Sequence, residues 1–250
     1  MILLILMDMA TNFPVLGILS NMSQITINNQ RFIKIAHRGA SAYEPENTLL
    51  SFKRAIEMRA DMIEFDVRLS NDGRLVIMHD ERVDRTTNGN GLVREKTLSE
   101  LRRLDAGKGE RVPILEEVID LAKRKTGFVI ELKEQGTEEG VISLVKENGL
   151  IGDVFIVSFH QDLIKRVKDL ESRIRTGLIL YSSPDPIRLA KECLTDVVAP
   201  FHNFVVKDLV QEAHSSNLIL ITWTVDSREE AEKLKGMGVD GIVTNKPDVI

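Results

Sequence analysis

The stretch IAHRGAS at residues 35–41 ends an apolar run in a basic pair and leads into a turn that contains glycine. Two later segments have the same form, because IEFDV at 63–67 and VIMHD at 76–80 also place ionisable side chains where an apolar run stops. Parallel α/β folds hold their catalytic groups at the carboxyl ends of strands. The three segments together therefore predict one active site built from strand ends.

Short β-branched runs alternate with amphipathic stretches along the rest of the chain. The strand candidates are 33–37, 61–67, 127–132, 154–158, 175–180, 196–199, 218–224 and 240–244. The helix candidates are 47–59, 113–126, 137–148, 160–171, 184–193, 206–216 and 227–237. This alternation predicts a parallel sheet with helices outside, and eight strands predict a closed (β/α)8 TIM barrel. A doubly wound open sheet is the alternative, although no G-x-G-x-x-G follows a strand.

The interval 68–112 interrupts the alternation. It contains the hairpin signal NDG at 71–73, the segment that ends in His79-Asp80, a polar stretch and a short helix around 97–104. We interpret it as a small insertion after the second strand, placed where it can wall a substrate pocket. The predicted organisation is an N-terminal extension over residues 1–30 and a single barrel over residues 31–250.

Composition narrows the classes of partner and compartment. The 250 residues suffice for one barrel, and 43% apolar with 28% charged residues is ordinary for a soluble globular protein. The net charge of −5 argues against nucleic acid as a partner. Cys193 is the only cysteine, so no intrachain disulfide forms, and a cytoplasmic location is expected.

The N-terminal residues are apolar over 1–7 and mostly apolar over 13–19. Asp8 and Pro14 interrupt these runs, and no basic residue precedes Arg31. A signal peptide has a basic start, and a membrane span needs about 20 apolar residues, so neither is expected. The segment is expected to be a packed or frayed extension, or the product of a translation start placed too early, with Met22 as the alternative start.

Three acidic residues form a candidate metal site. Glu64 and Asp66 are two apart on a strand, so their side chains share one face, and Glu131 ends the next strand. Carboxylates forced together need a cation or a proton between them. Three carboxylates without a cysteine suit a hard divalent cation, Ca²⁺ or Mg²⁺. The alternative is a surface carboxylate pair with a salt bridge from Lys133.

His37 and His79 are the candidate acid and base, because imidazole exchanges protons near neutral pH. A lone histidine after an apolar run is more often a core group, but each of these two lies beside acidic residues. His160 and His202 follow strand ends and have weaker claims. His214 lies on an amphipathic stretch and is expected to face solvent.

The chain resembles the glycerophosphodiester phosphodiesterase family in eight short pieces that occur in the family's order. They are HRG at 37–39, PENT at 45–48, E-x-DV at 64–67, HD at 79–80, RTT at 85–87, ELK at 131–133, SF at 158–159 and WTV at 223–225. The resemblance implies a barrel with a small insertion, metal ligands at Glu64, Asp66 and Glu131, and a catalytic pair at His37 and His79.

The implied activity is metal-dependent hydrolysis of glycerophosphodiesters to sn-glycerol 3-phosphate and an alcohol such as choline or ethanolamine. The nucleophile is water or the neighbouring glycerol hydroxyl of the substrate. A lysophospholipase D-type hydrolase and a non-catalytic phosphodiester-binding barrel are the alternatives.

Further residues have expected roles around such a substrate. Arg38 and Lys133 are expected to hold the phosphate, since arginine binds phosphoryl oxygens in a bidentate manner and lysine adds a point charge. Phe159 and Trp223 are expected to contact the substrate, with Trp223 as a wall for the glycerol carbons or as a core residue. Asn47 and Thr48 are expected to cap a helix. Asp80 is expected either to orient His79 or to face solvent. The family shares Glu46, for which the sequence assigns no chemistry.

The chain departs from the family pattern at two places. Arg59 stands where the family usually has glycine before the second strand, and the segment 245–250 ends where the family normally continues into a closing helix. The bare outer face predicts that residues 1–20 pack over it, in the same chain or in a symmetry mate, which would make a homo-oligomer.

Overall fold

Eight parallel strands close into a barrel in the computed structural model, which describes residues 32–250. The expectations for residues 1–30 therefore lie outside the described residues. The strands are β1 (Ile33–Ala36), β2 (Met62–Leu69), β4 (Gly127–Leu132), β5 (Val154–Ser158), β6 (Arg175–Leu180), β7 (Val197–Pro200), β8 (Ile219–Thr222) and β9 (Gly241–Thr244). Each pairs with the next in parallel, and β9 pairs back to β1. The (β/α)8 barrel is thus confirmed, and the open-sheet alternative is wrong.

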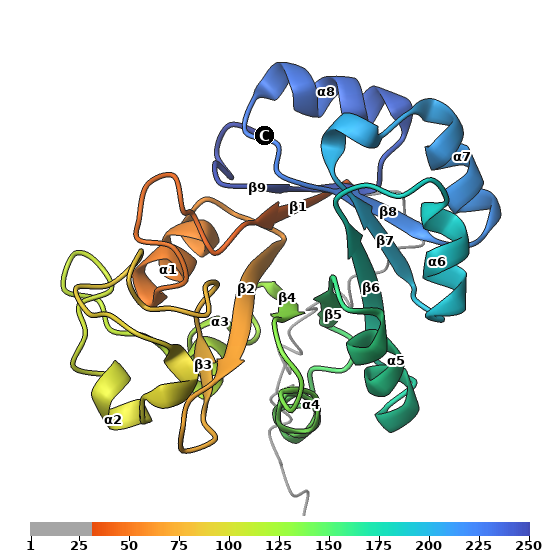
Figure 1. Cartoon of the computed structure of the whole chain (residues 1–250). Coiled ribbons are helices and arrows are strands. Elements are labelled where there is room, and N and C mark those ends of the chain that lie inside the picture. Colours follow the sequence, from red (N-terminus) through yellow and green to blue (C-terminus); the bar gives the residue numbers. More distant parts are fainter. Residues whose placement is uncertain (1–31) are drawn as a thin grey trace, which may run out of the picture.

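Seven helices connect consecutive strands and surround the barrel, as Figure 1 shows. They are α1 (Leu49–Glu57), α3 (Leu115–Ala122), α4 (Glu138–Glu147), α5 (Gln161–Leu170), α6 (Pro186–Glu192), α7 (Lys207–Ser215) and α8 (Arg228–Met237). A short 3-10 turn, η3 (His202–Phe204), precedes α7. Each helix lies within the range predicted for it, because the apolar stripe that packs on the sheet is visible in the sequence.

Side chains along β2 alternate between two environments. Ile63, Phe65 and Val67 face outward into the core between the barrel and the helices, where Phe65 packs edge-on against Phe52 and Phe128. Met62 belongs to the apolar interior of the barrel. Since the strand period is two, Glu64 and Asp66 face the same way as Met62, toward the carboxyl-end mouth of the barrel.

The insertion lies between β2 and α3 and has a small core of its own. It contains β3 (Leu75–Ile77), which pairs antiparallel with β2, then η2 (Val93–Glu95) and α2 (Leu98–Leu101). The predicted hairpin is present, since the Gly73 N–H donates to the Ser70 carbonyl at 3.0 Å. In Figure 1 this segment lies beside α1, so it extends one side of the barrel mouth.

Arg59 takes the backbone conformation that glycine would supply. Its φ of +57° is left-handed, and its N–H donates to the Ile56 carbonyl at 2.9 Å. The Ala60 N–H reaches the Ala55 carbonyl at 3.1 Å, which completes a Schellman motif at the end of α1. The departure at residue 59 therefore leaves the turn unchanged.

After β9 the described chain adds a turn and no helix. The carbonyl of Val249 accepts from Arg228 Nε at 3.1 Å, and Ile250 packs on the apolar cluster beneath α7 and α8. Within residues 32–250, every helix is too short or too polar to cross a lipid bilayer.

Candidate active site

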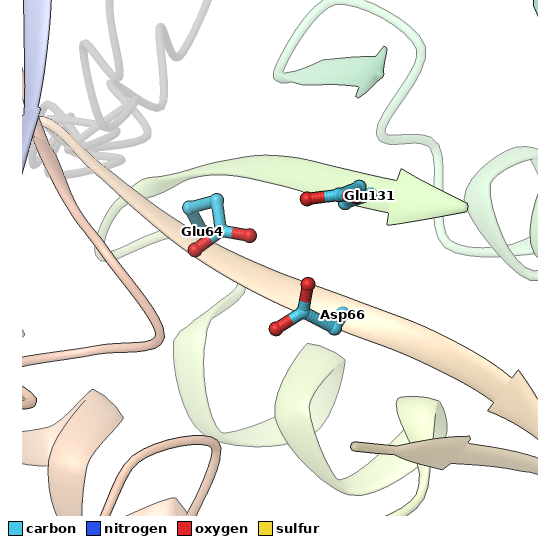
Figure 2. A group of neighbouring side chains, drawn as sticks. All are labelled: Glu64, Asp66 and Glu131. Carbon is cyan, nitrogen blue, oxygen red and sulfur yellow. The ribbon is translucent and has the colours of Figure 1, made fainter. Parts of the chain in front are cut away.

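Three carboxylates converge at the barrel mouth, two from β2 and one from β4 (Figure 2). Asp66 is the register partner of Glu131, and Glu64 is one inward position earlier on β2. One oxygen from each carboxylate lies within 4.8 Å of the others, and all three side chains are buried. The predicted acidic cluster therefore exists as a compact buried group; the alternative of a surface pair is wrong in its placement, although the salt bridge from Lys133 that it included is present.

Each carboxylate has one oxygen held by a neighbouring donor. Glu64 Oε2 accepts the Arg38 backbone N–H at 2.7 Å, Asp66 Oδ2 accepts Asn47 Nδ2 at 2.7 Å, and Glu131 Oε1 accepts Lys133 Nζ at 2.6 Å. Among residues 32–250, the second oxygens accept no hydrogen bond, although Lys133 Nζ lies 3.5 Å from Asp66 Oδ1. Asp66 Oδ1 is buried and lacks a hydrogen bond there. Three oxygens are thus available to one ligand.

Burial, mutual repulsion and nearby cations give the three carboxyl groups different pKa values. Burial raises the pKa of Glu64 well above its usual value, and the charges of Asp66 and Glu131 raise it further. Burial and the Asp66 charge raise the pKa of Glu131 to about 7. Burial acts the same way on Asp66, but Lys133 and Arg38 outweigh it and lower the pKa of that carboxyl.

This donor set fits a hard divalent cation. Oxygen ligands are what Ca²⁺ and Mg²⁺ prefer, and the buried Asp66 Oδ1, which accepts no hydrogen bond, is what a cation at this position would satisfy. A cation would also reduce the repulsion that raises the two glutamate pKa values. Glu64, Asp66 and Glu131 are the residues that could hold it.

The HRG turn after β1 is shaped by two left-handed residues. Arg38 has a φ of +52° and Gly39 a φ of +77°. A Cβ at residue 39 would lie 2.3 Å from Ser51 Oγ and 2.6 Å from the Ser51 carbonyl carbon, so only glycine fits against α1. This close approach aims the Arg38 N–H at Glu64 and brings its guanidinium to Glu46, with 2.8 Å between Nη1 and Oε1.

His37 stands at the end of β1 and is held by the end of β9. Its backbone N–H donates to the Thr244 carbonyl, and its Nδ1 lies 2.7 Å from Asn245 Oδ1. Burial lowers the pKa of His37 to about 4, and the Arg38 charge acts in the same direction. The imidazole is therefore neutral at neutral pH.

His79 comes from the insertion, two residues beyond β3, and faces the same pocket as His37. Its Nδ1 lies 2.6 Å from Asp80 Oδ1, so Asp80 orients the ring, which is one of the two expectations stated for it. Burial lowers the pKa of His79, while the Asp66 charge and the Asp80 hydrogen bond oppose that effect.

Arg85 links His79 to the HRG turn. Its Nε donates to Asp80 Oδ2 at 2.7 Å, and its two terminal nitrogens each lie 2.8 Å from a different oxygen of Glu46. Glu46 also accepts from Arg38. Glu46, for which the sequence assigned no chemistry, thus pairs with both Arg38 and Arg85, and Arg85 belongs to the RTT piece.

Asn47 and Lys133 differ from the simplest expectations for them. Thr48 is the N-cap of α1 and forms a capping box with Ser51, so the prediction that Asn47 caps this helix is wrong; the Asn47 side chain instead holds Asp66. Lys133 Nζ pairs with Glu131 and lies 3.5 Å from Asp66 Oδ1. The ammonium therefore neutralises the acidic cluster, which leaves its predicted contact with phosphate as a prediction.

The pocket at the mouth has a polar side and an apolar side. Its volume is about 320 Å³. The polar side is His37, Arg38, Glu64, His79 and Glu131, and the floor is the apolar barrel interior. The opposite wall is aromatic and consists of Phe159, Tyr181 and Trp223.

The aromatic wall is fixed by its own contacts. Phe159 packs edge-on against Trp223 with 5.6 Å between the ring centroids, and Trp223 Nε1 donates to the Ala199 carbonyl at 2.9 Å. Tyr181, which the sequence did not single out, stacks on Phe201 at 5.0 Å and is 62% exposed. Phe159 and Trp223 thus line the pocket, and their predicted contact with substrate stays a prediction.

The remaining histidines lie outside the pocket lining. His160 precedes α5 at the surface, and His214 lies 3.0 Å from Asp240 on the outer face, as its predicted solvent exposure requires. His202 Nδ1 pairs with Glu230 Oε1 at 2.5 Å.

Fold and site together define a class, the (β/α)8-barrel enzymes that gather acidic and basic side chains at the carboxyl ends of their strands. The model of the glycerophosphoryl diester phosphodiesterase family matches residues 37–249. The chain therefore belongs to the glycerophosphoryl diester phosphodiesterase family, as the short sequence pieces implied, and it is an enzyme of that class.

Named relatives agree with this membership. A glycerophosphodiester phosphodiesterase of Caldanaerobacter subterraneus is 40% identical over 230 residues, which cover 86% of this chain and 95% of that protein. A glycerophosphodiester phosphodiesterase of Bacillus subtilis is 32% identical over 89% of this chain and 86% of its own length.

Solved structures agree in fold. A glycerophosphodiester phosphodiesterase from Agrobacterium tumefaciens superposes with a TM-score of 0.81 at 28% identity, over 88% of this chain and 98% of that one. A phosphodiesterase of Oleispira antarctica, solved in complex with the product sn-glycerol-3-phosphate, has a TM-score of 0.81 at 28% identity over 87% of this chain and 94% of that one.

Proposed function

We propose that this protein hydrolyses glycerophosphodiesters to sn-glycerol 3-phosphate and an alcohol, with a divalent cation and two histidines. The observation that carries the proposal is the pocket in which His37 and His79 lie together with the carboxylate cluster. The Oleispira antarctica relative, which binds sn-glycerol-3-phosphate, supports the choice of product.

Glu64, Asp66 and Glu131 would hold Ca²⁺ or Mg²⁺ through the three oxygens that accept no hydrogen bond from the described residues. A bound divalent cation neutralises phosphoryl charge and lowers the pKa of a hydroxyl that it binds. Arg38 binds the phosphate, because it lines the pocket and its guanidinium is held there by Glu46 at Nη1 and by an ion pair from Nε to Asp66 Oδ2 at 3.5 Å.

The two histidines take different parts in proton transfer. His37 is the base, since its ring is neutral and its Nδ1 partner is an uncharged amide. His79 is the acid that protonates the leaving oxygen, since the Asp80 carboxylate at its Nδ1 and the Asp66 charge oppose the effect of burial and support a proton on this ring. Each group moves a proton at Nε2, the ring nitrogen that faces away from its partner.

The aromatic wall receives the carbon skeleton of the substrate. Phe159 and Trp223 face the polar side across the pocket, so one substituent of the phosphodiester packs against them. The apolar floor and the exposed Tyr181 also suit a single acyl chain, and this observation favours lysophospholipase D-type hydrolysis as the second candidate activity.

An assay of glycerol 3-phosphate release tests the proposal. Purified protein is incubated with glycerophosphocholine, with EDTA, and with EDTA followed by excess Mg²⁺ or Ca²⁺. We expect release that EDTA abolishes and the added cation restores. Lysophosphatidylcholine in a parallel reaction, with release of choline as the readout, tests the second candidate, because that cleavage leaves the acyl chain on the glycerol phosphate. Unchanged release in EDTA would contradict the metal-dependent mechanism.

Location and assembly are also part of the proposal. The unpaired Cys193 is buried, which supports a reducing, cytoplasmic compartment. The substrate is a small molecule, and the acidic net charge supports the expectation of no nucleic acid partner. A homo-oligomer stays a prediction.

A further inference from the structure

His37 is the end of a chain of hydrogen bonds that starts at a carboxylate outside the pocket lining. Asp226, just before α8, accepts Asn245 Nδ2 at 2.7 Å through Oδ2 and the Asn245 backbone N–H at 2.8 Å through Oδ1. Asn245 Oδ1 then lies 2.7 Å from His37 Nδ1. Neither Asp226 nor Asn245 belongs to the carboxylate cluster or donates to it.

The chemistry of the groups fixes the direction of every bond in this chain. An ionised carboxylate only accepts, so the amide nitrogen of Asn245 must face Asp226 and its oxygen must face His37. An amide oxygen also only accepts, so at 2.7 Å the Nδ1 of His37 must carry the proton. The Ser41 hydroxyl lies 2.7 Å from this oxygen and 2.7 Å from the His37 carbonyl, and its one proton is shared between these two acceptors, which leaves the result unchanged.

We propose that Asn245 and Asp226 are positioning residues that hold His37 in its Nδ1–H tautomer and so leave Nε2 as the nitrogen that accepts the substrate's proton. The inference rests on the proposed function, in which His37 is the base. Asp226 acts on His37 indirectly, through Asn245. The Asp226 charge sets the orientation of the Asn245 amide, and the amide sets which imidazole nitrogen of His37 is basic.

A pair of substitutions exchanges the two groups and keeps the chain of hydrogen bonds. Asp226→Asn removes the charge, so the Asn245 amide is free to turn and His37 populates both tautomers. Asn245→Asp places a second carboxylate beside Asp226, and the repulsion disturbs the pair. In the double variant, the new carboxylate at position 245 accepts from His37 Nδ1 while the new amide at position 226 donates to that carboxylate, so the original tautomer returns.

The expected result is a rescue. Each single variant loses on the order of 10- to 100-fold in kcat on glycerophosphocholine, less than the full contribution of a proton-transfer group, and the double variant recovers most of that loss. KM changes little, because Asp226 and Asn245 do not line the pocket. Glu230→Gln is the matched control: it removes a carboxylate that pairs with His202 Nδ1 and should leave kcat unchanged.

Nitrogen-15 spectra of the metal-free protein read the tautomer directly and independently of activity. The protein has five histidines, and His37→Gln assigns the signals of residue 37. We expect a protonated Nδ1 and an unprotonated Nε2 in the wild type and the double variant, and averaged signals in Asp226→Asn. A wild-type spectrum with the proton on Nε2 would overturn the proposal even if a variant failed to fold.

Different results would disprove the positioning role of Asn245 and Asp226 and the proposed function. Full activity of His37→Ala would remove the base and with it the proposed function. An essential His37 together with wild-type kcat and an unchanged spectrum in Asp226→Asn would leave the function standing and overturn the positioning role.

Discussion

Asp66 and Glu131 are register partners on the neighbouring strands β2 and β4, and both side chains face the barrel mouth. Two buried carboxylates in register repel one another, and the pKa of Glu131 rises to about 7 as burial and that repulsion act together. The close approach of Asp66 and Glu131 therefore lowers the stability of the metal-free protein, and the same approach creates an oxygen site for a cation.

Removal of one carboxylate should separate stability from metal binding. Folding raises the pKa of the Glu131 carboxyl to about 7, so its negative charge destabilises the folded protein near pH 8. Glu131→Gln removes this charge, and the metal-free variant should therefore melt at a higher temperature than the wild type at that pH. It should also lose most of the rise in melting temperature that Mg²⁺ or Ca²⁺ gives. Glu139→Gln, at an exposed carboxylate on α4, is the control. Equal metal-induced shifts in Glu131→Gln and wild type would remove Glu131 from the site.

Metal affinity should depend on pH below neutrality. A cation binds the ionised carboxylates, so it must displace the proton that Glu131 keeps below about pH 7. Affinity should fall by at least about tenfold from pH 8 to pH 6, since Glu131 releases a proton when the cation binds and Glu64, whose pKa is also raised, adds to the effect. Calorimetric titrations with Ca²⁺ near pH 6 and pH 8 measure this difference. Equal dissociation constants at the two pH values would show that the raised pKa does not belong to a metal ligand.

The arginine that joins Asp80 to Glu46 should matter for rate although it lies at the rim of the site. Arg85→Gln frees both carboxylates, so His79 and Arg38 lose their orientation, and kcat should fall on the order of 10-fold. Arg82→Gln breaks an exposed pair with Asp84 in the same insertion and should change nothing. Steady-state kinetics on glycerophosphocholine compare the two, and equal rates would make the Arg85 contacts incidental.

Glycine at residue 59 should stabilise the fold. The left-handed φ of +57° strains Arg59, and glycine adopts it without strain, so Arg59→Gly should raise the free energy of unfolding by about 1 kcal/mol. Lys53→Gly, at an exposed position inside α1, should lower it by about 1 kcal/mol. Urea unfolding of both variants measures the two effects, and a loss of stability in Arg59→Gly would mean that the Arg59 side chain has a role of its own.

The barrel and the position of the carboxylates could both be predicted because each depends on a local pattern in the sequence. Near-continuous apolar strands and the period of two on β2 are local properties, so they place Glu64 and Asp66 on one face without knowledge of the rest of the chain. The placement of His37 and His79 at the barrel mouth could be predicted because each follows an apolar run that ends in ionisable side chains, and because eight short pieces, HRG and HD among them, occur in the family's order.

Contacts between distant side chains could not be predicted in this way. Asn47 reaches Asp66 across 19 residues, Arg85 reaches Glu46 across 39, and Asn245 reaches His37 across 208. Each depends on how the closed barrel brings loops together, and no local pattern records that. A polar residue at a strand end near a candidate histidine, as Asn245 is at the end of β9, is the one signal that could have been followed.

The kcat of variants that lack one or both histidines tests most directly the central claim that His37 and His79 carry out proton transfer. kcat on glycerophosphocholine with Mg²⁺ or Ca²⁺ is measured for His37→Ala, His79→Ala and the double variant, with His214→Ala as the control on the outer face. Each catalytic single variant should lose roughly 10²- to 10⁴-fold, and the double variant should lose far less than the product of the two, because the histidines act on one reaction as a unit. Near-full activity of either single variant would contradict the account.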